Sequence, residues 1–427
     1  STQTAVIVLS SRLYPDGKGD SRRLRREVAT FVAREGAGKP ASPSAPATGT
    51  LLTGIDILER EGFARLRGRT IGLVTHAAAV DHAGRRTVDV LRGAPGLTLV
   101  ALFSPEHGLR GDQDTAVADG RDPQSGLPVH SLYGARLRPS DAALAGIDTL
   151  VYDLQDAGAR FYTYESTLGY LLETAAEKKL ALVVLDRPNP LGGARMEGPM
   201  RDPGPSTLLG YHPLPIRHGM TVGELARLFN GERGLGAKLE VVALQGWSRQ
   251  DTWDRTGLPW HNPSPNLRSF DEALLYPGIA LLETTNLSVG RGTAHPFERV
   301  GAPWLDGARL AAALAEAQLP GVSFKVTSFT PESSAFAHQA CTGVEIHLND
   351  RSRFDPVLTG LTFASLLRKL HPGEWQSKGL SILLGNQEAF LAITRGESPA
   401  QVAARWQAGL ADFARAREKY LLYPAAL

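Results

Sequence analysis

The stretch LFSPEHGLRG, residues 102–111, ends an apolar run and presents a carboxylate, Glu106, beside an imidazole, His107, which is a candidate for substrate binding. A second glutamate, Glu197, lies in the glycine-rich stretch GGARMEGP. Two carboxyl groups that face one crevice can cleave a glycosidic bond: one protonates the leaving oxygen, and the other attacks the sugar or activates water. Carboxylates at strand ends are more often caps or ion-pair partners than catalysts, so this pair by itself is a weak signal.

Residues of a second kind could bind a sugar. The segment GARFYTYEST follows the strand-end aspartate Asp153 and contains Arg160, Tyr162 and Tyr164. Sugar sites use aromatic faces against ring C–H groups and polar tips for hydroxyl groups. These four residues are therefore substrate-binding candidates, although we expect at least one aromatic side chain to pack beneath the following helix.

A glycine-rich segment at residues 284–304 contains Asn286 and Arg291. An arginine fork binds a carboxylate through two parallel hydrogen bonds. Both residues are candidates for substrate binding, and a purely structural loop is equally consistent with the sequence.

Four short, continuously apolar runs alternate with helix-like segments in the first part of the chain. The runs are residues 69–76, 97–108, 148–156 and 180–190, and the helix-like segments include residues 84–92 and 166–178. This alternation predicts a mostly parallel sheet covered on both faces. Each run ends in polar residues, and Asn189 is the substrate-binding candidate among those that end the fourth run. Open parallel sheets bind ligands outside the carboxyl ends of their strands. The sequence therefore predicts an α/β fold with one polar crevice.

After about residue 220, apolar runs and helix-like segments no longer alternate regularly. We expect a Rossmann-like domain at residues 51–220 and a smaller α+β auxiliary domain at residues 221–427. The expected strands of the second domain are residues 238–244, 322–329 and 342–348, and its expected helices are residues 307–317, 357–370 and 399–420.

The N-terminal residues form a separate piece. Residues 37–50 are rich in Pro, Ala, Ser and Gly, which predicts a linker. Residues 1–36 contain SSRLYPDGKGD and resemble the last strand and helix of serine β-lactamase-like hydrolases. This resemblance implies the tail of an upstream domain, and an irregular extension is the alternative.

The composition excludes several classes of function. Forty-six basic and 44 acidic residues give a net charge of +2, which excludes a strong general attraction to nucleic acid or anionic membranes. The single cysteine excludes a disulfide framework within the chain. No apolar run approaches the roughly 18 to 20 residues that cross a bilayer. The G-x-S-x-G, H-E-x-x-H and P-loop templates are missing, and no G-x-G-x-x-G follows the first strand, so we expect neither a metal nor a cofactor.

Several motifs along the chain resemble those of a known family. They are FSPEHGLRG, YDLQDAGARFYTY, LDRPNPLGG, MEGPM, PIRHGMTVGELA, NPSPN, NLSVGRGT with PFERVGAPW, and CTGVEI. Over residues 51–427 the chain resembles the exo-β-N-acetylmuramidases of the NamZ type. The resemblance implies a Rossmann-like domain, a smaller auxiliary domain and an active site in the cleft between them. It also implies, without a cofactor, release of N-acetylmuramic acid from the non-reducing end of peptidoglycan fragments.

The resemblance also assigns residues. Glu106 matches the main candidate for the catalytic glutamate, and Glu197 is our choice for the second carboxylate. Tyr162 and Tyr164 match the YTY element, and Arg291 matches the GRGT element.

The chain departs from the family pattern at two places. His76 stands where the first strand of the family ends in asparagine, and Leu267-Arg268 follows PSPN in place of Met-Pro. We expect these changes to alter sugar contacts or substrate preference without removing the chemistry.

Selection of N-acetylmuramic acid has a physical requirement. This sugar differs from N-acetylglucosamine by a lactyl ether that bears a carboxylate, so a selective site needs a cation. Arg160, Arg187 and Arg291 are the candidates at the crevice. We favour Arg291 because its glycine neighbours permit close backbone approach to a ligand.

Other questions stay open at this point. A non-catalytic protein that binds muropeptides in the same cleft is the alternative function, and the intact pair of Glu106 and Glu197 argues against it. Retaining, inverting and substrate-assisted routes are all compatible with the sequence, and the oligomeric state cannot be read. We expect saccharides such as N-acetylmuramyl-N-acetylglucosamine as substrates, and a periplasmic or secreted location.

Overall fold

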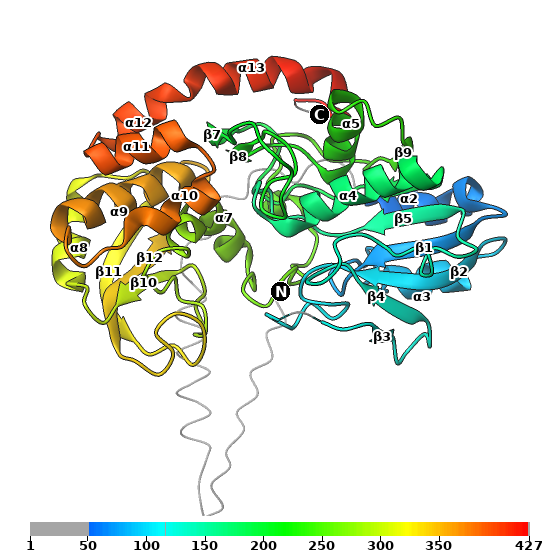
Figure 1. Ribbon diagram of the computed structural model, residues 1–427, viewed down its shortest axis with the longest axis horizontal. Helices are drawn as coiled ribbons and strands as arrows, with labels where there is room; N and C mark the ends of the chain where they lie inside the picture. The colour runs from blue at the N-terminus through cyan, green and yellow to red at the C-terminus, as the bar shows by residue number, and fades with distance from the viewer. Residues whose placement is uncertain (1–50, 116, 426–427) are drawn as a thin grey trace, which may run out of the picture. The chain divides into compact units, whose positions relative to one another are not determined.

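The computed structural model describes residues 51–115 and 117–425, so the predictions for residues 1–36 and 37–50 lie outside the described residues. Most of the first part of the chain folds around a seven-stranded sheet with the order β3-β4-β2-β1-β5-β6-β9 (Figure 1). All neighbouring strands are parallel except β3 and β4. The strands are β1 (Thr70–Thr75), β2 (Thr98–Ser104), β3 (Gly120–Arg121), β4 (Pro128–Ser131), β5 (Thr149–Asp153), β6 (Ala181–Leu185) and β9 (Lys238–Val242).

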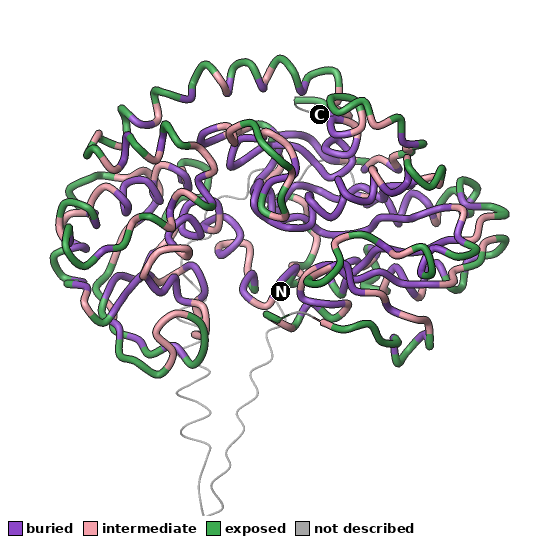
Figure 2. Tube along the Cα trace, viewed as in Figure 1, coloured by how far each residue is buried: buried purple, intermediate pink, exposed green. Residues whose placement is uncertain are grey.

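Helices cover both faces of this sheet because successive strand residues point to opposite sides. In β5, Val151 lies in one apolar cluster with residues of α2 (Gly54–Arg60) and α3 (Thr87–Gly93). Its neighbour Tyr152 lies in the other cluster, with residues of α4 (Thr163–Lys178) and α5 (Val222–Glu232). Every residue of β5 is buried, as Figure 2 shows for the central strands. The predicted α/β fold with a mostly parallel sheet is confirmed.

Strand β9 corrects the predicted domain boundary. We placed residues 238–244 in the second domain, but β9 pairs in parallel with β6, with Val183 opposite Glu240. Helix α5 also packs on this sheet. The domain assignment failed because β9 is an edge strand in which exposed and half-buried residues alternate, so it lacks the continuous apolar run of the inner strands. The sheet domain therefore extends past residue 220.

The second part of the chain is an α+β unit, as predicted. A three-stranded antiparallel sheet has the order β10-β12-β11, and helices α8 and α9 pack against it or against each other. Helix α7 packs on α9. The bounds are α7 (Phe270–Ile279), β10 (Arg299–Ala302), α8 (Gly307–Glu316), β11 (Val322–Phe329), β12 (Cys341–Leu348) and α9 (Pro356–Leu370).

The expected helix at residues 399–420 is broken into two. Helix α12 (Pro399–Arg405) ends at Trp406, whose φ of -101° and ψ of 3° leave the helical region, and α13 (Gln407–Arg417) follows. The indole of Trp406 is buried in the core. The terminal Arg417 donates to the carbonyl oxygens of His218 and Gly219, so α13 ties the C-terminal helices to the sheet domain.

Short elements complete the described chain. They are η1 (Ala64–Leu66), β7 (Glu197–Met200), β8 (Pro215–Arg217), α6 (Trp253–Thr256), η2 (Ala280–Leu282), η3 (Ser377–Gly379), α10 (Leu380–Leu384), α11 (Gln387–Arg395) and η4 (Glu418–Tyr420). Strands β7 and β8 form a two-stranded antiparallel sheet. None of the helices described between residues 51 and 425 is both long and apolar enough to cross a membrane.

Candidate active site

Glu106 lies just beyond the carboxyl end of β2, in a tight turn. His107 and Gly108 both adopt left-handed backbone conformations, with φ of 70° and 72°. This conformation costs a non-glycine residue about 1 to 2 kcal/mol, so the surrounding structure must hold His107 in place. The Nδ1 of His107 donates to the carbonyl oxygen of Gln113 at 2.7 Å, which closes the turn. The predicted substrate-binding residue His107 thus shapes the loop that presents Glu106.

Hydroxyl groups surround the carboxyl group of Glu106. The hydroxyl of Thr163, the first residue of α4, donates to Glu106 Oε2 at 2.7 Å. Burial and a hydrogen bond to Glu106 raise the pKa of Tyr133 to about 12, so its phenol stays protonated at neutral pH. The Glu106 side chain is partly exposed, and no arginine or lysine forms an ion pair with it among the described residues. This carboxyl group is therefore accessible and held by neutral donors.

Arg291 enters the site from the second part of the chain. It lies between Gly290 and Gly292, whose φ values of 82° and 79° favour glycine. Its Nη1 donates to Glu283, and its Nη2 lies 3.2 Å from Asp114 Oδ2. Burial raises the pKa of Glu283, although Arg291 pulls it down.

Glu106 and Arg291 share neighbours, which brings the two parts of the chain into one site. The charges of both act on the phenols of Tyr133 and Tyr276. The charge of Glu106 also acts on Glu283. The candidate active site is therefore built where the carboxyl end of β2 meets the Arg291 turn.

The two tyrosines of the YTY element support this site from behind. Tyr162 and Tyr164 are 4% and 0% exposed, and their rings are in edge contact at 4.6 Å. Both hydroxyls donate to the carbonyl oxygen of Pro263, at 2.9 and 2.8 Å. Their faces cannot stack on a sugar in this structure, which corrects the prediction. They hold the NPSPN segment against the site instead, because that carbonyl is their shared acceptor.

His76, which stands where the family pattern has asparagine, is buried beside these two tyrosines. Its Nε2 accepts a hydrogen bond from the backbone N–H of Gln155 at 3.0 Å, and its ring contacts Tyr164 edge-on. Burial lowers the pKa of His76 to about 3, so the imidazole is neutral at physiological pH. His76 is 3% exposed, so this side chain supports the tyrosines rather than facing solvent.

Two of the residues predicted to bind substrate, Asp153 and Arg160, instead bond to groups in the protein interior. Asp153 is fully buried, and its carboxylate pairs with Arg187, with Nη2 at 2.9 Å, and accepts from the hydroxyl of Thr87. Arg160 is 1% exposed and donates to four carbonyl oxygens. Their hydrogen-bonding groups point into the protein, so the structure does not place either side chain for contact with substrate. The prediction failed because a strand-end position does not reveal which side chains have internal partners.

The two predicted asparagines also bond inward. Asn189 is 1% exposed, donates to the carbonyl of Met220 at 2.9 Å and accepts from the N–H of Leu191. Asn286 donates to the carbonyl of Glu374 and accepts from the N–H of Gln376. The buried Asn189 is held inward, which corrects its assignment as a substrate-binding residue, whereas the half-buried Asn286 stays a candidate.

Glu197 lies in a different environment from Glu106. It begins β7 and pairs with Arg217 at 2.6 Å and with Arg195 at 2.8 Å. Burial raises the pKa of Glu197 to about 7, against the pull of both arginines and with the help of the Asp355 charge. Among the described residues, Glu197 has no hydrogen-bond or ion-pair partner in common with Glu106. The pairing of Glu197 with Glu106 therefore stays a prediction.

The structure adds residues that sequence reasoning missed. Thr163 and Tyr133 contact Glu106, while Asp114 and Glu283 contact Arg291. Thr163 lies within the YTY element, where attention to its hydroxyl could have found it. Asp114 lies in an acidic stretch that reads as a solvated loop, and only its contact with a distant arginine reveals its place.

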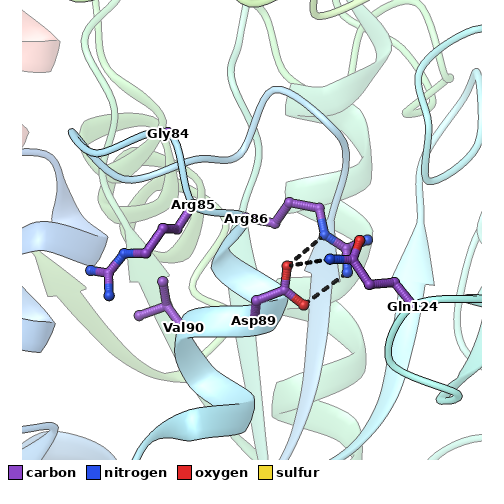
Figure 3. A pocket seen from close by; sticks show the side chains of 6 residues that line it. All are labelled: Gly84, Arg85, Arg86, Asp89, Val90 and Gln124. Atoms are coloured by element: carbon purple, nitrogen blue, oxygen red, sulfur yellow. Dashed lines mark hydrogen bonds and ion pairs between the residues drawn. The ribbon is translucent and has the colours of Figure 1, made fainter.

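The structure also has a hollow of about 360 Å³ around the start of α3, and none of the residues around Glu106 lines it. Figure 3 shows Arg86 in this hollow turned toward Asp89 and Gln124. Arg86 also pairs with Asp122, and Arg85 pairs with Asp81 and Glu59. Because these cations already have carboxylate partners, the hollow does not offer a free anion site.

Comparison with known proteins identifies the family of most of the described chain. A family model for the N-terminal part of the exo-β-N-acetylmuramidase NamZ matches residues 71–271, and the C-terminal model matches residues 274–423. The two models meet near the start of α7.

Individual relatives agree with these models. The peptidoglycan β-N-acetylmuramidase NamZ of Bacillus subtilis (strain 168) is 40% identical over 376 residues, covering 87% of this chain and 91% of that protein. A crystal structure of a DUF1343 family protein from Bacteroides fragilis NCTC 9343 has a TM-score of 0.81 at 34% identity, covering 87% of this chain and 99% of its own. A second such protein from that organism has a TM-score of 0.73 at 29% identity, covering 88% and 99%. The chain therefore belongs to the NamZ family of exo-β-N-acetylmuramidases.

Proposed function

We propose that the protein is a glycoside hydrolase that acts on peptidoglycan and releases N-acetylmuramic acid from the non-reducing end of its fragments. Family membership supports this activity. The observation that carries it is the partly exposed Glu106 carboxyl group, bound by hydroxyls where the two parts of the chain meet. A binding protein has no need for such a group.

Glu106 is the proposed proton donor to the leaving oxygen. Glycosidic cleavage passes through a transition state with positive charge on the sugar, and a proton must reach the departing oxygen as the bond breaks. Thr163 and Tyr133 orient the carboxyl group without neutralising it, since both donate from hydroxyls. The same group can take a proton from water in a later step.

The second carboxyl group is open to two assignments. Glu197 is the choice made from the sequence, and its raised pKa suits a proton donor. Glu283 is the alternative, because its charge and that of Glu106 both act on the phenol of Tyr276, and the charge of Glu106 also acts on Glu283. The proposal therefore rests on Glu106 and does not depend on the pairing.

Arg291 is the proposed partner of the lactyl carboxylate. Its guanidinium lies near Glu106, as shared neighbours indicate, and its side chain is 24% exposed. Arg160 and Arg187 were the other candidates, but both are buried and have internal partners.

A chromogenic assay tests the activity. The protein is incubated with 4-nitrophenyl β-N-acetylmuramic acid and, in parallel, with its N-acetylglucosamine analogue. We expect release from the muramic substrate alone and a loss of about 10²- to 10⁴-fold in Glu106→Gln, the usual worth of a general acid. Tight binding of N-acetylmuramic acid without any release would instead make the protein a muropeptide-binding protein.

Arg291→Ala tests the lactyl contact in the same assay. A charge-assisted pair contributes about 1.5 to 3 kcal/mol, so kcat/KM for the muramic substrate should fall about 10- to 100-fold. Binding of N-acetylglucosamine, measured by calorimetry, should change little, while binding of N-acetylmuramic acid weakens. Equal losses of affinity for both sugars would remove Arg291 from this role.

The expected substrates and location follow from the proposal. N-acetylmuramyl-N-acetylglucosamine and larger muropeptides would carry the scissile bond, and peptidoglycan lies outside the cytoplasmic membrane. We therefore propose a periplasmic or secreted protein. Fractionation of the native host, with activity confined to the cytoplasm, would contradict this location.

A further inference from the structure

Arg291, the cation of the candidate active site, is already paired with a carboxylate of the protein itself, that of Asp114. Asp114 lies in the connection between β2 and β3, and its Oδ2 is 3.2 Å from Arg291 Nη2. The amide nitrogen of Asn266 lies 3.0 and 2.8 Å from its two oxygens, and His107 Nδ1 lies 3.5 Å from Oδ1. Although burial opposes it, the hydrogen bonds from Asn266 and Arg291 keep the pKa of Asp114 below its ordinary value. Asn266 and Arg291 are therefore the donors that hold this carboxylate.

The two acidic partners of Arg291 differ in how easily they can leave. Glu283 follows η2 in the second part of the chain, and its side chain is 26% exposed. Asp114 is 42% exposed and comes from a connection rather than a helix or strand. Because water can solvate an exposed carboxylate once its contacts break, Asp114 is the partner that gives way at lower cost.

A ligand carboxylate needs the same donors. Arg291 has a buried Nε with no hydrogen-bond partner in the described structure, adjacent to the Nη2 that contacts Asp114. A carboxylate that takes the Nε and Nη2 edge would make two parallel hydrogen bonds, against the one that Asp114 makes there. Such a ligand would exclude Asp114 from its present position.

We infer that Asp114 occupies the place of the substrate carboxylate on Arg291 and Asn266, so that a muramic-type sugar binds by displacing it. This inference rests on the proposed function and assigns Asp114 a role in specificity. A sugar without the lactyl group brings no carboxylate to replace Asp114, so it gains nothing from these donors. Selection is then a competition between two carboxylates for one group of donors.

Direct binding measurements test the competition. Dissociation constants for N-acetylmuramic acid and N-acetylglucosamine are measured by calorimetry on the wild type and on Asp114→Asn. The variant should bind N-acetylmuramic acid roughly three- to tenfold more tightly, the expected range for removing a partly exposed competing ion pair. Binding of N-acetylglucosamine should stay within about twofold, since it does not compete with Asp114.

Asp112→Asn is the matched control. It removes the same charge two residues away, where the side chain is 51% exposed and pairs with Arg110 rather than Arg291. It should leave both dissociation constants unchanged. Asp114→Ala is the second variant, and it should show the same direction as Asp114→Asn.

Three outcomes decide against the inference. Weaker binding of N-acetylmuramic acid by the Asp114 variants would show that Asp114 orients Arg291 for the ligand. Equal tightening for both sugars would show only a looser loop. Wild-type hydrolysis of the chromogenic muramic substrate, with no tightening in the variants, would overturn the inference while the proposed function stands. If the wild type neither hydrolyses that substrate nor binds N-acetylmuramic acid, the proposed function fails and takes the inference with it.

Discussion

Glu106 and Asp153 lie at the carboxyl ends of β2 and β5, the two strands that flank β1 in one sheet, yet they have different roles. Asp153 is the last residue of β5, fully buried, with its carboxylate on Arg187 and Thr87. Glu106 lies two residues beyond β2, partly exposed, with hydroxyl donors and no cation in contact among the described residues. A buried, ion-paired carboxylate is held in place by its internal partners, whereas an accessible, hydroxyl-bound one can meet a ligand.

The comparison shows that a position at a strand end does not by itself decide the role of a carboxylate. Both positions lie at the edge where α/β sheets bind ligands, so position made both residues candidates. Their neighbours decide the outcome: Arg187, from the next strand end, turns Asp153 into a clamp between β5 and β6. In the part of the chain that the structure describes, no arginine forms an ion pair with Glu106, and Arg291 is instead paired with Glu283 and Asp114.

The largest expected effect is a loss of stability when the pair of Asp153 and Arg187 is broken. Asp153→Asn leaves the buried Arg187 without its ionic partner, which should lower the free energy of unfolding by about 3 to 5 kcal/mol. Urea titration measures this loss. The folded fraction should keep its activity if Asp153 has no contact with substrate.

A surface carboxylate provides the control for Asp153. Asp141 has an 81% exposed side chain and pairs with Lys178, so Asp141→Asn should change the unfolding free energy by less than about 1 kcal/mol. An Asp153 variant that is as stable as this control but inactive would return Asp153 to the active site and end the contrast with Glu106.

A smaller effect is expected for turnover when Glu197 is changed. With no partner in common with Glu106 among the described residues, Glu197 resembles Asp153 more than Glu106. Glu197→Gln should therefore alter kcat by less than about fivefold, far from the 10²-fold or greater loss that removal of a general acid produces.

Thermal melting must accompany the Glu197 measurement, because the change also leaves Arg217 with a neutral partner. A loss of kcat as large as that of Glu106→Gln, at an unchanged melting temperature, would support the prediction from the sequence that Glu197 is the second catalytic carboxyl group. It would also show that ion pairing does not exclude a catalytic carboxylate in this fold.

Prediction from the sequence succeeded for elements whose pattern is local. The continuous apolar runs identified β1, β2, β5 and β6, because strands buried on both faces need apolar residues at every position. It predicted a strand at residues 238–244, where β9 lies, but assigned that strand to the wrong domain, and it missed the break in the helix at Trp406. The tyrosines of the YTY element were placed near the right site but with the wrong exposure.

By itself, the sequence determined the α/β class, the family motifs and the candidacy of Glu106, since each depends on residues that are adjacent or periodic along the chain. Only the tertiary structure decided which polar side chains remain accessible. Glu106 meets Thr163, Asp153 meets Arg187 and Arg291 meets Asp114 across long stretches of chain. The physical reason is that a carboxylate's solvation, charge and function are set by the groups packed around it, and those groups come from elements that no local pattern brings together.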